Sequence, residues 1–465
     1  MKTTSDLSQA LLRTGQAYVL ERLRRLDSAG QQRLEGELAA LDFDLLGELV
    51  DLARGQQLPR APRTFEPPEL FPSLRSQEQE RLAAQARAAG IDLLRAGKVG
   101  FVLVAGGQAS RLGFDAPKGA FPIGPVTGQS LFAVHAQRLR GAARRFSART
   151  PWYVMTSPAN DRSSRAFFEQ HRFFGLPRAD VFFFSQDMLP ALDEHGRMLF
   201  SAPDALYLAP NGHGGCLLAL AKSGALDDMR QRGVEQLSYF QVDNPLVRPA
   251  DPLFLGLHDQ ARAGMSSKVV EKRDAAEKVG VLGRVDGRLS CIEYSDLPAE
   301  LREARSSQGE LAFRAGNIAV HALSVEFLEQ ITRGGLALPW HLARKKMTVI
   351  EADGRSVECT GVKFETFVFD ALASTPASVV LEVQRSEEFS PVKNASGEDS
   401  PASCRRDLCR LFERWVRAAG LPLPDLDAAG NRPIEVDPFF AETQDEFLAH
   451  EKLQPDVRPT GHLYA

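Results

Sequence analysis

The sequence predicts an α/β protein whose core is a doubly wound, mixed and mostly parallel sheet. Between residue 99 and about residue 275, short apolar runs rich in β-branched residues alternate with stretches of helical periodicity. Such alternation needs crossover connections, and these connections produce parallel strands. After residue 275 the strand-like runs lie closer together, and the pair Asp286-Gly287 between two of them indicates a hairpin. These observations predict a parallel core with a smaller antiparallel part beside it.

The expected elements follow from the same patterns in chain order. Apolar residues at helical spacing predict helices in the first 95 residues, and prolines between 58 and 72 interrupt them. A helix over 77–97 leads into the first buried strand, over 99–105. Further strands are expected over 152–155, 181–184, 237–242 and 268–270, and helices over 131–145, 162–171, 215–221 and 252–263. The hairpin is expected over 279–294, and a helix over 404–418 begins a small C-terminal part.

Composition excludes several classes of protein. Of the 465 residues, 43% are hydrophobic, which is enough for a folded core. Lysine and arginine together number 56 against 60 for aspartate and glutamate, so there is no basic excess of the kind that binds nucleic acid or a membrane surface. No apolar run reaches about 20 residues, the N-terminus does not look like a secretory signal, and five scattered cysteines argue against a disulfide framework. We therefore expect a cytoplasmic protein without nucleic-acid or membrane partners, either a monomer or a weak homo-oligomer.

The most informative segment directly follows the first buried strand, at the edge where a doubly wound sheet binds its ligands. It begins with Ala105-Gly106-Gly107 and continues through Arg111 to Pro117-Lys118. The two glycines let backbone N–H groups approach a phosphate or a base closely. Arg111 offers a planar fork for pairs of oxygen atoms, and Lys118 offers a compact ammonium group. The segment therefore predicts a site for a phosphorylated ligand.

This segment resembles the signature of the sugar nucleotidyltransferases, Gly-x-Gly-Thr-Arg followed by Pro-Lys. It departs from that signature at Ala109, where the family usually has a glycine, and at Ser110, where it has a threonine. Other segments resemble the eukaryotic-type UTP-dependent uridylyltransferases, among them Pro151-Trp152-Tyr153-Val154-Met155-Thr156-Ser157, Ala209-Pro210-Asn211-Gly212-His213-Gly214-Gly215, Gln241-Val242-Asp243-Asn244, Ile292-Glu293-Tyr294-Ser295, Ala315-Gly316-Asn317-Ile318 and Glu388-Phe389-Ser390-Pro391-Val392-Lys393. In order and spacing these segments are most similar to those of the UDP-N-acetylglucosamine pyrophosphorylases, from about residue 75 to residue 420.

The resemblance implies a Rossmann-like nucleotidyltransferase core. It also implies the reaction of UTP with N-acetylglucosamine 1-phosphate to give UDP-N-acetylglucosamine and pyrophosphate. Residues 1–95 are then expected to form a helical N-terminal segment, residues 96–400 the catalytic domain and residues 401–465 a small C-terminal domain.

The resemblance further assigns roles to individual residues. The cations expected to act on the phosphates are Arg111, Lys118 and Lys393. The residues expected to bind the nucleotide are Ala105, Gly106, Gly107, Gln186, Gly212 and His213. The residues expected to bind the sugar are Gly280, Glu293, Asn317, Phe367 and Phe369. Asp243 ends a predicted strand and projects toward the same crevice as the glycines. The resemblance implies that Asp243 binds a divalent metal ion, Mg²⁺ or Mn²⁺.

Some of these residues have a purely structural alternative. His213 is nearly as well explained as a packed histidine. Phe367 and Phe369 are two positions apart on a strand-like run and so share a face, where they border an acetamido methyl group or simply belong to the core.

Three other functions compete with this interpretation. The first is a uridylyltransferase for glucose 1-phosphate, or a broad UDP-sugar pyrophosphorylase, because pocket shape decides between the sugars. The second is a non-catalytic paralogue that binds a UDP-sugar, which Ala109 keeps open. The third, a hydride-transferring dinucleotide enzyme, predicts a GxGxxG sequence that the glycine segment lacks.

Overall fold

The computed structural model of the chain describes residues 4–55, 63–294, 296–307, 309–336 and 338–465. They form two compact units, each assembled from three separate stretches of the chain. Unit 1 consists of Met1–Pro62, Gln186–Cys216 and Leu338–Val368, and unit 2 of Arg63–Ser185, Leu217–Ala337 and Phe369–Ala465. The division into three consecutive domains stays a prediction, and part of the proline-rich stretch expected over 58–72 lies outside the described residues.

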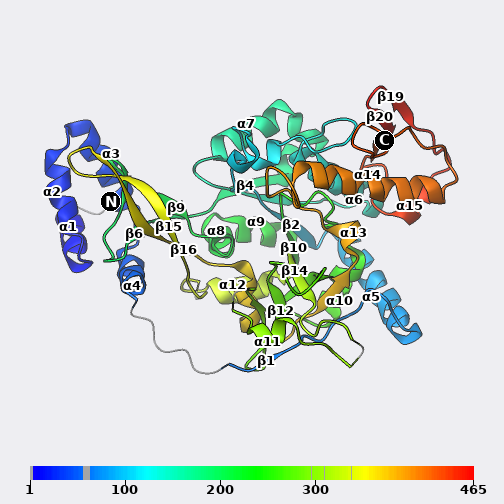
Figure 1. Cartoon of the computed structure of the whole chain (residues 1–465), viewed down its shortest axis with the longest axis horizontal. Coiled ribbons are helices and arrows are strands. Elements are labelled where there is room, and N and C mark those ends of the chain that lie inside the picture. The colour runs from blue at the N-terminus through cyan, green and yellow to red at the C-terminus, as the bar shows by residue number, and fades with distance from the viewer. Residues whose placement is uncertain (1–3, 56–62, 295, 308, 337) are drawn as a thin grey trace. The chain divides into compact units, whose positions relative to one another are not determined.

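A mixed sheet of ten described strands forms the centre of unit 2 (Figure 1). Its parallel part has the order β10-β2-β3-β4, and its antiparallel part is built around β14, which pairs with β10, β11 and β12. The strands are β1 (Phe65–Glu66), β2 (Val99–Val104), β3 (Trp152–Thr156), β4 (Val181–Ser185), β10 (Gln236–Gln241), β11 (Met265–Glu271), β12 (Val281–Val285), β13 (Arg288–Ile292), β14 (Ala315–Ser324) and β17 (Val380–Val383). The predicted parallel core is confirmed, and so is the hairpin, because β12 and β13 pair across the turn at Asp286 and Gly287.

Helices cover this sheet as the alternating pattern predicts. They are α5 (Gln77–Arg95), α6 (Leu131–Phe146), α7 (Asp161–Gln170), α9 (Ala225–Arg232), α10 (Pro252–Gln260), α11 (Ala299–Arg302), α12 (Val325–Thr332) and α13 (Arg385–Glu388). Short 3₁₀ helices are η1 (Ser110–Leu112), η2 (Lys118–Ala120), η3 (Arg172–Gly175) and η4 (Arg178–Asp180). Helices α5 and α10 cross at glycines, because a Cβ on Gly90 would lie 1.9 Å from the Pro252 carbonyl oxygen and one on Gly256 would lie 1.7 Å from that of Ala86.

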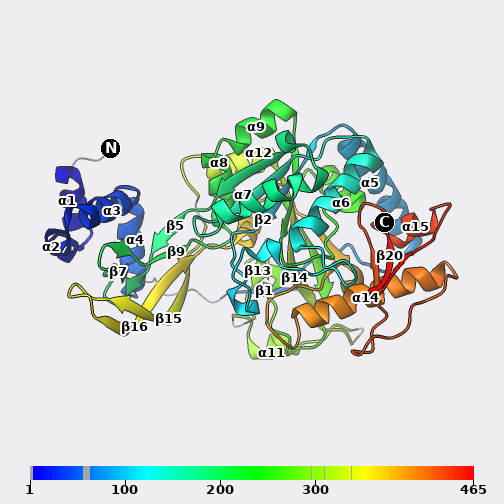
Figure 2. The same cartoon turned by 90° about the horizontal axis from the view of Figure 1, so that it is seen from above.

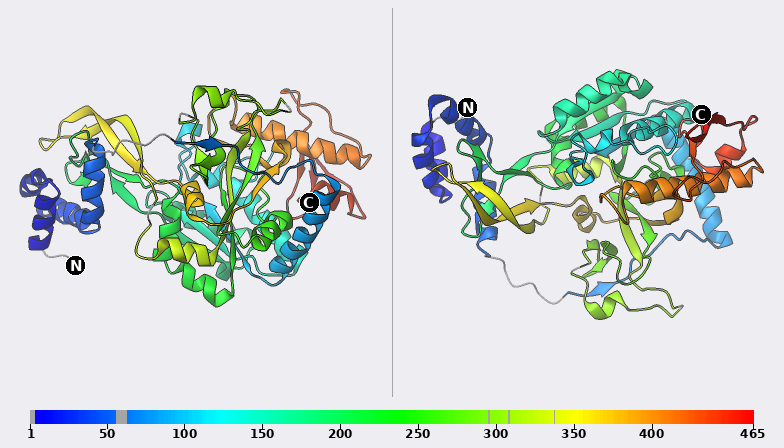
Figure 3. Two further views of the ribbon diagram at one scale, coloured as in Figure 1. Left: turned by 90° about the horizontal axis from the view of Figure 1, so that it is seen from below. Right: turned by 45° about the horizontal axis from the view of Figure 1, so that its top comes forward.

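The C-terminal stretch of unit 2 is fastened to α6. It contains α14 (Pro401–Ala418), α15 (Gln444–Leu448) and a small sheet of β18 (Ile434–Val436), β19 (Asp456–Arg458) and β20 (Gly461–Tyr464), shown in orange and red in Figure 3. The buried carboxylate of Glu442 accepts from Arg138 at 3.2 Å and from Arg145 at 2.9 Å, both on α6. Since α6 also carries His135, which contacts the end of β10, this attachment helps to fix the edge of the sheet where the candidate site lies.

Unit 1 combines four N-terminal helices with strands from two later stretches of the chain (Figure 2). The helices are α1 (Thr4–Arg13), α2 (Tyr18–Arg25), α3 (Ser28–Ala39) and α4 (Phe43–Ala53), and the strands are β5 (Met188–Pro190), β6 (Leu192–Asp193), β7 (Phe200–Ala202), β8 (Ala205–Leu206), β9 (Leu208–Pro210), β15 (His341–Ile350) and β16 (Ser356–Glu365). Leucines of the helices and apolar residues such as Phe200, Val362 and Phe364 share one buried cluster. The helices predicted for the N-terminal region are confirmed, and their apolar faces are buried against these strands.

Two elements span the boundary between the units, α8 (Gly215–Lys222) and the 3₁₀ helix η5 (Val368–Ser374). In the described part of the chain, no helix combines the length and apolar character that crossing a bilayer requires.

Candidate active site

The glycine segment leaves the end of β2 and is held by side chains that follow the neighbouring strand β3. Asn160 donates from Nδ2 to the carbonyl oxygens of Ala105 at 2.9 Å and Gly107 at 3.2 Å, and the Ser157 hydroxyl donates to the Gly106 carbonyl at 2.8 Å. Within the described residues, the N–H groups of Gly106 and Gly107 donate to no other protein group. A Cβ placed on Gly107 would meet no atom within 4 Å, so this residue borders open space. The segment thus keeps unused amide donors beside open space, and their binding of a ligand stays a prediction.

Ala109 does not disturb this arrangement. Its backbone has a φ of −94°, which any L-residue adopts, and its side chain is only 1% exposed. The Ala109 N–H donates to the Ala116 carbonyl at 3.2 Å, which closes the segment on itself. The methyl group is therefore buried in the loop rather than displayed on its open side.

The same loop carries the two predicted cations. Arg111 lies on η1 and is exposed. Lys118 begins η2, and its backbone N–H donates to the Gly107 carbonyl at 3.2 Å. Its ammonium nitrogen lies 3.1 Å from Oδ2 of Asp243, with side-chain exposures of 17% for Lys118 and 11% for Asp243. The structure therefore brings Lys118 and Asp243 into direct contact.

Asp243 is placed by the pairing of β10 with β2. These strands are parallel and in register up to Gln241 and Val104, so their carboxyl ends lie at the same edge of the sheet. Beneath this end, His135 lies with Nε2 3.0 Å from the Val242 carbonyl oxygen. Burial lowers the pKa of His135 to about 4, so the ring is neutral at pH 7 and Nε2 donates to the carbonyl.

The segment that carries Lys393 is tied to the same strand end. The Val392 N–H donates to the Asp243 carbonyl at 2.9 Å. Asn244 donates from Nδ2 to the Glu388 carbonyl at 2.7 Å and accepts from the Ser390 N–H at 3.1 Å. Lys393 itself is exposed, with its ammonium nitrogen 5.7 Å from the centre of the Phe389 ring. Unit 2 therefore gathers the glycine loop, Lys118, Asp243 and the Lys393 segment at one edge of its sheet.

Three of the residues predicted to bind the sugar also lie together in unit 2. The Asn317 N–H donates to the Gly280 carbonyl at 2.8 Å. A Cβ on Gly280 would lie 3.5 Å from Oε1 of Glu293 and 2.9 Å from Sγ of Cys291, so only glycine fits there without a shift. Asn317 also places Nδ2 3.5 Å from the Cys291 sulfur and accepts from the Ala319 N–H at 3.0 Å. Cys291 is therefore a neighbour of this group.

Unit 1 holds Gln186, Gly212, His213 and Phe367. Gln186 is 6% exposed, and Gly212 has a φ of +81° that favours glycine. His213 accepts at Nδ1 from the Val368 N–H at 3.2 Å and stacks on the Phe367 ring with centroids 5.2 Å apart. Burial, with a smaller contribution from His341, lowers the pKa of His213 to about 4. The packed interpretation of His213 thus has direct support, and its role toward the nucleotide stays a prediction.

The expected strand through Phe367 and Phe369 is wrong. Strand β16 ends at Glu365, and Phe369 lies in the 3₁₀ helix η5. The reason is that the backbone after Glu365 bonds outside the strand ladder: the Thr366 N–H donates to the Asn211 carbonyl at 2.9 Å and the Val368 N–H to His213. The two rings therefore do not share a strand face, and their contact with the sugar remains an untested expectation. Ser295, at the end of the Glu293 segment, lies outside the described residues.

Sequence reasoning missed the supports of the site, which are Ser157, Asn160, His135 and Asn244. Ser157, Asn160 and Asn244 each stand just after a predicted strand, and a hydroxyl or amide directly after a strand is the signal that could have indicated these three residues. His135 lies within a helix and has no such signal.

Comparisons with known proteins identify the family of the chain. The family model of UTP–glucose-1-phosphate uridylyltransferase matches residues 68–410. The UDP-N-acetylhexosamine pyrophosphorylase-like protein 1 of Xenopus tropicalis is 40% identical over 367 residues, which cover 76% of this chain and 71% of that protein. UDP-N-acetylglucosamine diphosphorylase 2 of Arabidopsis thaliana is 39% identical over 348 residues, covering 71% of this chain and 68% of that protein.

Solved structures give the same result for the fold. The uridine diphosphate N-acetylglucosamine pyrophosphorylase of Trypanosoma brucei superposes with a TM-score of 0.81 at 28% identity, covering 95% of this chain and 93% of that one. A UDP-glucose phosphorylase of the same organism has a TM-score of 0.63 at 18% identity, covering 90% of this chain and 87% of that one, and shares the fold. The chain therefore belongs to the UTP–glucose-1-phosphate uridylyltransferase family and is a nucleotidyltransferase.

Proposed function

We propose that this enzyme transfers the uridylyl group of UTP to N-acetylglucosamine 1-phosphate and releases pyrophosphate. The names of the relatives at 39–40% identity support N-acetylated hexosamine as the sugar. The observation that carries the chemistry is the contact of Lys118 with Asp243 at 3.1 Å, with the Lys393 segment bonded to the backbone of the same aspartate.

The main barrier to this reaction is the repulsion between two anions. A phosphate oxygen of the sugar 1-phosphate attacks the α-phosphorus of UTP, a new P–O bond forms, and the bond to pyrophosphate breaks. A sugar phosphate is already a good nucleophile, so the reaction needs no general base. Catalysis then consists of positioning the reactants and stabilising their charge.

The cations of unit 2 are suited to this task. Arg111 and Lys118, together with the free N–H groups of Gly106 and Gly107, act on the triphosphate of UTP. Lys393 acts on the phosphate of the sugar. The Lys118 ammonium group, which neutralises Asp243 in the structure, shifts toward the phosphates when they bring their own charge to the site.

A divalent metal ion is the expected cofactor, because enzymes of this family generally need one. Within the described residues, no group of three or more His, Cys, Asp or Glu side chains could hold an ion by protein ligands alone. A single carboxylate at a phosphate site fits Mg²⁺, which commonly takes one or two carboxylates and completes its shell with phosphate oxygens and water. Asp243 would hold this ion, which supplies further positive charge to the phosphates.

Different residues recognise the base and the sugar. Gln186 pairs with the uracil edge beside the Gly212 backbone, and His213 lies near the nucleotide. Glu293 and Asn317 bind sugar hydroxyls, and Gly280 leaves room for the sugar ring. Phe367 and Phe369 border the acetamido methyl group. Glucose 1-phosphate lacks this methyl group and is the weaker substrate in this proposal.

A panel assay tests the proposal. The purified chain is mixed with Mg²⁺, each of UTP, ATP, CTP and GTP, and each of four sugar 1-phosphates: N-acetylglucosamine, N-acetylgalactosamine, glucose and mannose. We expect the highest pyrophosphate release with UTP and N-acetylglucosamine 1-phosphate. Equal or faster release with glucose 1-phosphate would overturn the proposed sugar. If none of the four sugar 1-phosphates supported pyrophosphate release, uridylyl transfer itself would be contradicted.

Two variants separate the roles within the assay. Asp243→Asn is expected to need a higher Mg²⁺ concentration for half-maximal release, because an amide is a weaker ligand than a carboxylate. Lys393→Ala is expected to lose turnover without that change in Mg²⁺ dependence. A shift in Mg²⁺ dependence for Lys393→Ala alone would reverse the two assignments.

A further inference from the structure

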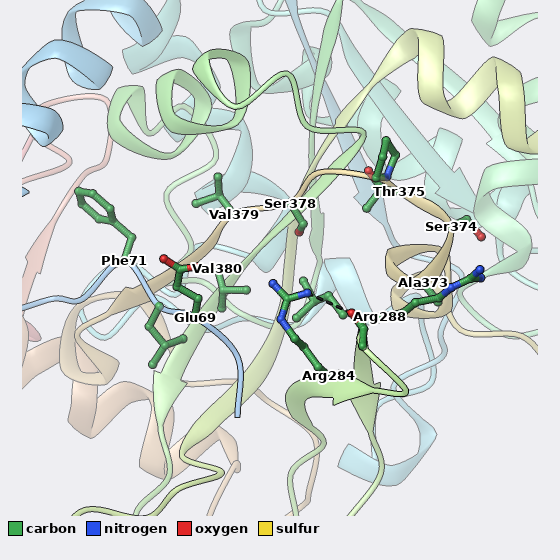
Figure 4. A pocket seen from close by; sticks show the side chains of 14 residues that line it. Glu69, Phe71, Arg284, Arg288, Ala373, Ser374, Thr375, Ser378, Val379 and Val380 are labelled. Atoms are coloured by element: carbon green, nitrogen blue, oxygen red, sulfur yellow. Dashed lines mark hydrogen bonds between the residues drawn. The ribbon is translucent and has the colours of Figure 1, made fainter. Parts of the chain in front are cut away.

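A pocket of about 630 Å³ opens in unit 2 at the turn end of the β12–β13 hairpin (Figure 4). Its lining comes from the hairpin, from the segment before α5 and from the stretch between η5 and β17. The volume falls in the range of about 300–1,000 Å³ that is usual for small-molecule sites. None of the residues predicted to bind the nucleotide, the sugar or the metal belongs to this lining.

The hairpin places two arginines on the pocket, Arg284 on β12 and Arg288 at the start of β13. Arg284 donates to the Gly287 carbonyl at 3.1 Å. Asp286, which lies between the two arginines, instead accepts from the backbone and hydroxyl of Thr64 at 2.9 and 3.2 Å. Among the described residues, no carboxylate forms an ion pair with either guanidinium group. Two arginines without an anionic partner on one pocket indicate an anionic ligand.

A buried hydroxyl supports the same conclusion. The Ser378 oxygen has almost no accessible surface and, in the described structure, no hydrogen-bond partner. In Figure 4 this hydroxyl points toward the side of the pocket where Arg284 lies. The neighbouring Thr375 hydroxyl, by contrast, is used within the fold, since it donates to the Ala377 carbonyl at 2.7 Å. An unpaired buried hydroxyl is costly, and a ligand oxygen would satisfy it.

We propose that this pocket binds a small phosphate monoester that carries hydroxyl groups, such as a sugar phosphate. The phosphate lies at Arg284, beside the Ser378 hydroxyl, and the planar fork of the guanidinium group matches its oxygen atoms. Arg288, whose side chain extends to the opposite side of the pocket in Figure 4, donates to the other end of the ligand. The carboxylate of Glu69, which also lines the pocket, accepts from ligand hydroxyls rather than from the phosphate. A free phosphate ion would fill only a small part of this volume, so an organic phosphate fits better.

The hairpin also connects this pocket to the predicted sugar site. Leu282 and Arg284 share one face of β12, Gly280 directly precedes this strand, and Leu282 pairs with Cys291. The Cys291 sulfur lies 3.5 Å from Nδ2 of Asn317. The hairpin thus joins the two sites through Leu282 and Cys291, and a ligand bound at the turn is expected to change the KM for the sugar 1-phosphate. This second expectation rests on the proposed function, whereas the binding itself does not.

Calorimetry on the full chain without UTP tests the binding. The probes are glucose 6-phosphate, inorganic phosphate and glucose, none of which is a sugar 1-phosphate. We expect glucose 6-phosphate to bind at least about tenfold more tightly than inorganic phosphate or glucose, because it engages both the arginines and the hydroxyl-binding groups. Equal affinity for inorganic phosphate would overturn the organic ligand, and no measurable binding of glucose 6-phosphate would overturn the site.

Variants locate the binding. Two arginine variants, Arg284→Ala and Arg288→Ala, are each expected to weaken the binding of glucose 6-phosphate at least about tenfold, and the second of them changes an exposed side chain. Ser378→Ala is expected to weaken the binding several-fold. The matched control is Arg305→Ala. Arg305 is exposed like Arg288 and, like Arg284, it donates to the carbonyl of a turn glycine, here Gly309. Lys393→Ala, which acts on the predicted active site, should leave the affinity unchanged. Loss of binding in Lys393→Ala, with full binding in both arginine variants, would place the ligand in the active site and overturn the proposal.

Kinetics then test the connection. With glucose 6-phosphate present, the parent enzyme should show a changed KM for the sugar 1-phosphate, and Arg288→Ala should not. Binding without any change in KM would overturn the connection through the hairpin and leave the site itself established. Because Arg288 belongs to no part of the predicted active site, the turnover of Arg288→Ala without the probe should equal that of the parent.

Discussion

Lys118 and Lys268 lie in the same compact unit, and each contacts carboxylate oxygens, yet their surroundings differ. The Lys118 ammonium group meets one carboxylate, Asp243, and both side chains keep some contact with solvent, at 17% and 11%. Lys268, on β11, is fully buried between Asp251 at 2.7 Å and Glu388 at 2.6 Å. The first lysine can exchange its partner for an incoming phosphate, whereas the second has no route to one.

The difference shows how one pair of residue types serves two purposes. Burial by itself would disfavour a charged Lys268, but the attraction of Asp251 and Glu388 outweighs it and raises the pKa of the ammonium group above its ordinary value. Glu388 ends α13, and its backbone carbonyl accepts a hydrogen bond from the side chain of Asn244, the residue after Asp243. The buried cluster therefore fixes the backbone on which the accessible pair depends, and removing each lysine should have a different consequence.

Lys268→Met should have the largest effect, and it should fall on stability. Two buried carboxylates would lose their partner, and breaking a buried pair of this kind typically costs about 3–5 kcal/mol. Urea unfolding followed by circular dichroism measures the free energy of unfolding. The control is Lys98→Met, which breaks the exposed pair of Lys98 and Glu235 at 2.9 Å and should leave the unfolding midpoint unchanged. Equal losses of unfolding free energy in Lys268→Met and Lys98→Met would mean that the buried cluster contributes no more to stability than the exposed pair.

Lys118→Ala should have the next largest effect, and it should fall on turnover. Loss of one preorganised cation is expected to raise the barrier by about 2–4 kcal/mol, which lowers kcat by a factor of about 30 to 900. Pyrophosphate release under saturating UTP measures it, and urea unfolding of the same variant should show a much smaller change than that of Lys268→Met. Lys118→Arg keeps the charge and should recover part of the rate. Turnover near that of the parent in Lys118→Ala would remove Lys118 from the mechanism.

The two clusters also differ in what the sequence could predict. Asp243 stands just beyond β10, Lys118 lies in the loop that follows β2, and parallel pairing of these two strands brings their ends together, so local patterns were enough. Asp251 and Lys268 belong to consecutive elements, whereas Glu388 lies 120 positions after Lys268, and each alone looks like an ordinary surface charge. Their pairing depends on how α10, β11 and α13 pack, which no local pattern reveals. The strand expected through Phe367 failed for a related reason, since bonds to Asn211 and His213, about 155 positions away, redirect the backbone.

His135 combines features of both lysines, because it is fully buried like Lys268 and contacts the Asp243 strand end like Lys118. Its pKa in the folded protein is lowered to about 4, whereas the unfolded chain has the ordinary value of about 6.5. As pH falls below 6.5 the unfolded state takes up a proton that the folded state does not, so stability is lost progressively down to about pH 4. From pH 7 to pH 5 this one histidine is expected to contribute about 2 kcal/mol of that loss.

The measurement is urea unfolding of the parent and of His135→Gln at both pH values. Glutamine does not titrate, and its amide can still donate to the Val242 carbonyl. The variant should therefore lose about 2 kcal/mol less than the parent between pH 7 and pH 5. Identical losses would show that folding does not lower the pKa of His135, which would contradict the effect assigned to its burial beneath Asp243.

Ala109→Gly should have the smallest effect, although it restores the residue that related enzymes usually carry. The methyl group is 1% exposed and turned into the loop, and a φ of −94° does not require glycine, so the variant gains no access for the nucleotide. Glycine instead adds freedom to the unfolded chain and should lower stability by about 0.5–1 kcal/mol, with kcat and the KM for UTP within about twofold of the parent. Steady-state kinetics and urea unfolding check both numbers. A tenfold gain in kcat would mean that the methyl group meets the nucleotide during the reaction, and that the loop opens further than the contacts between Ala109 and Ala116 allow.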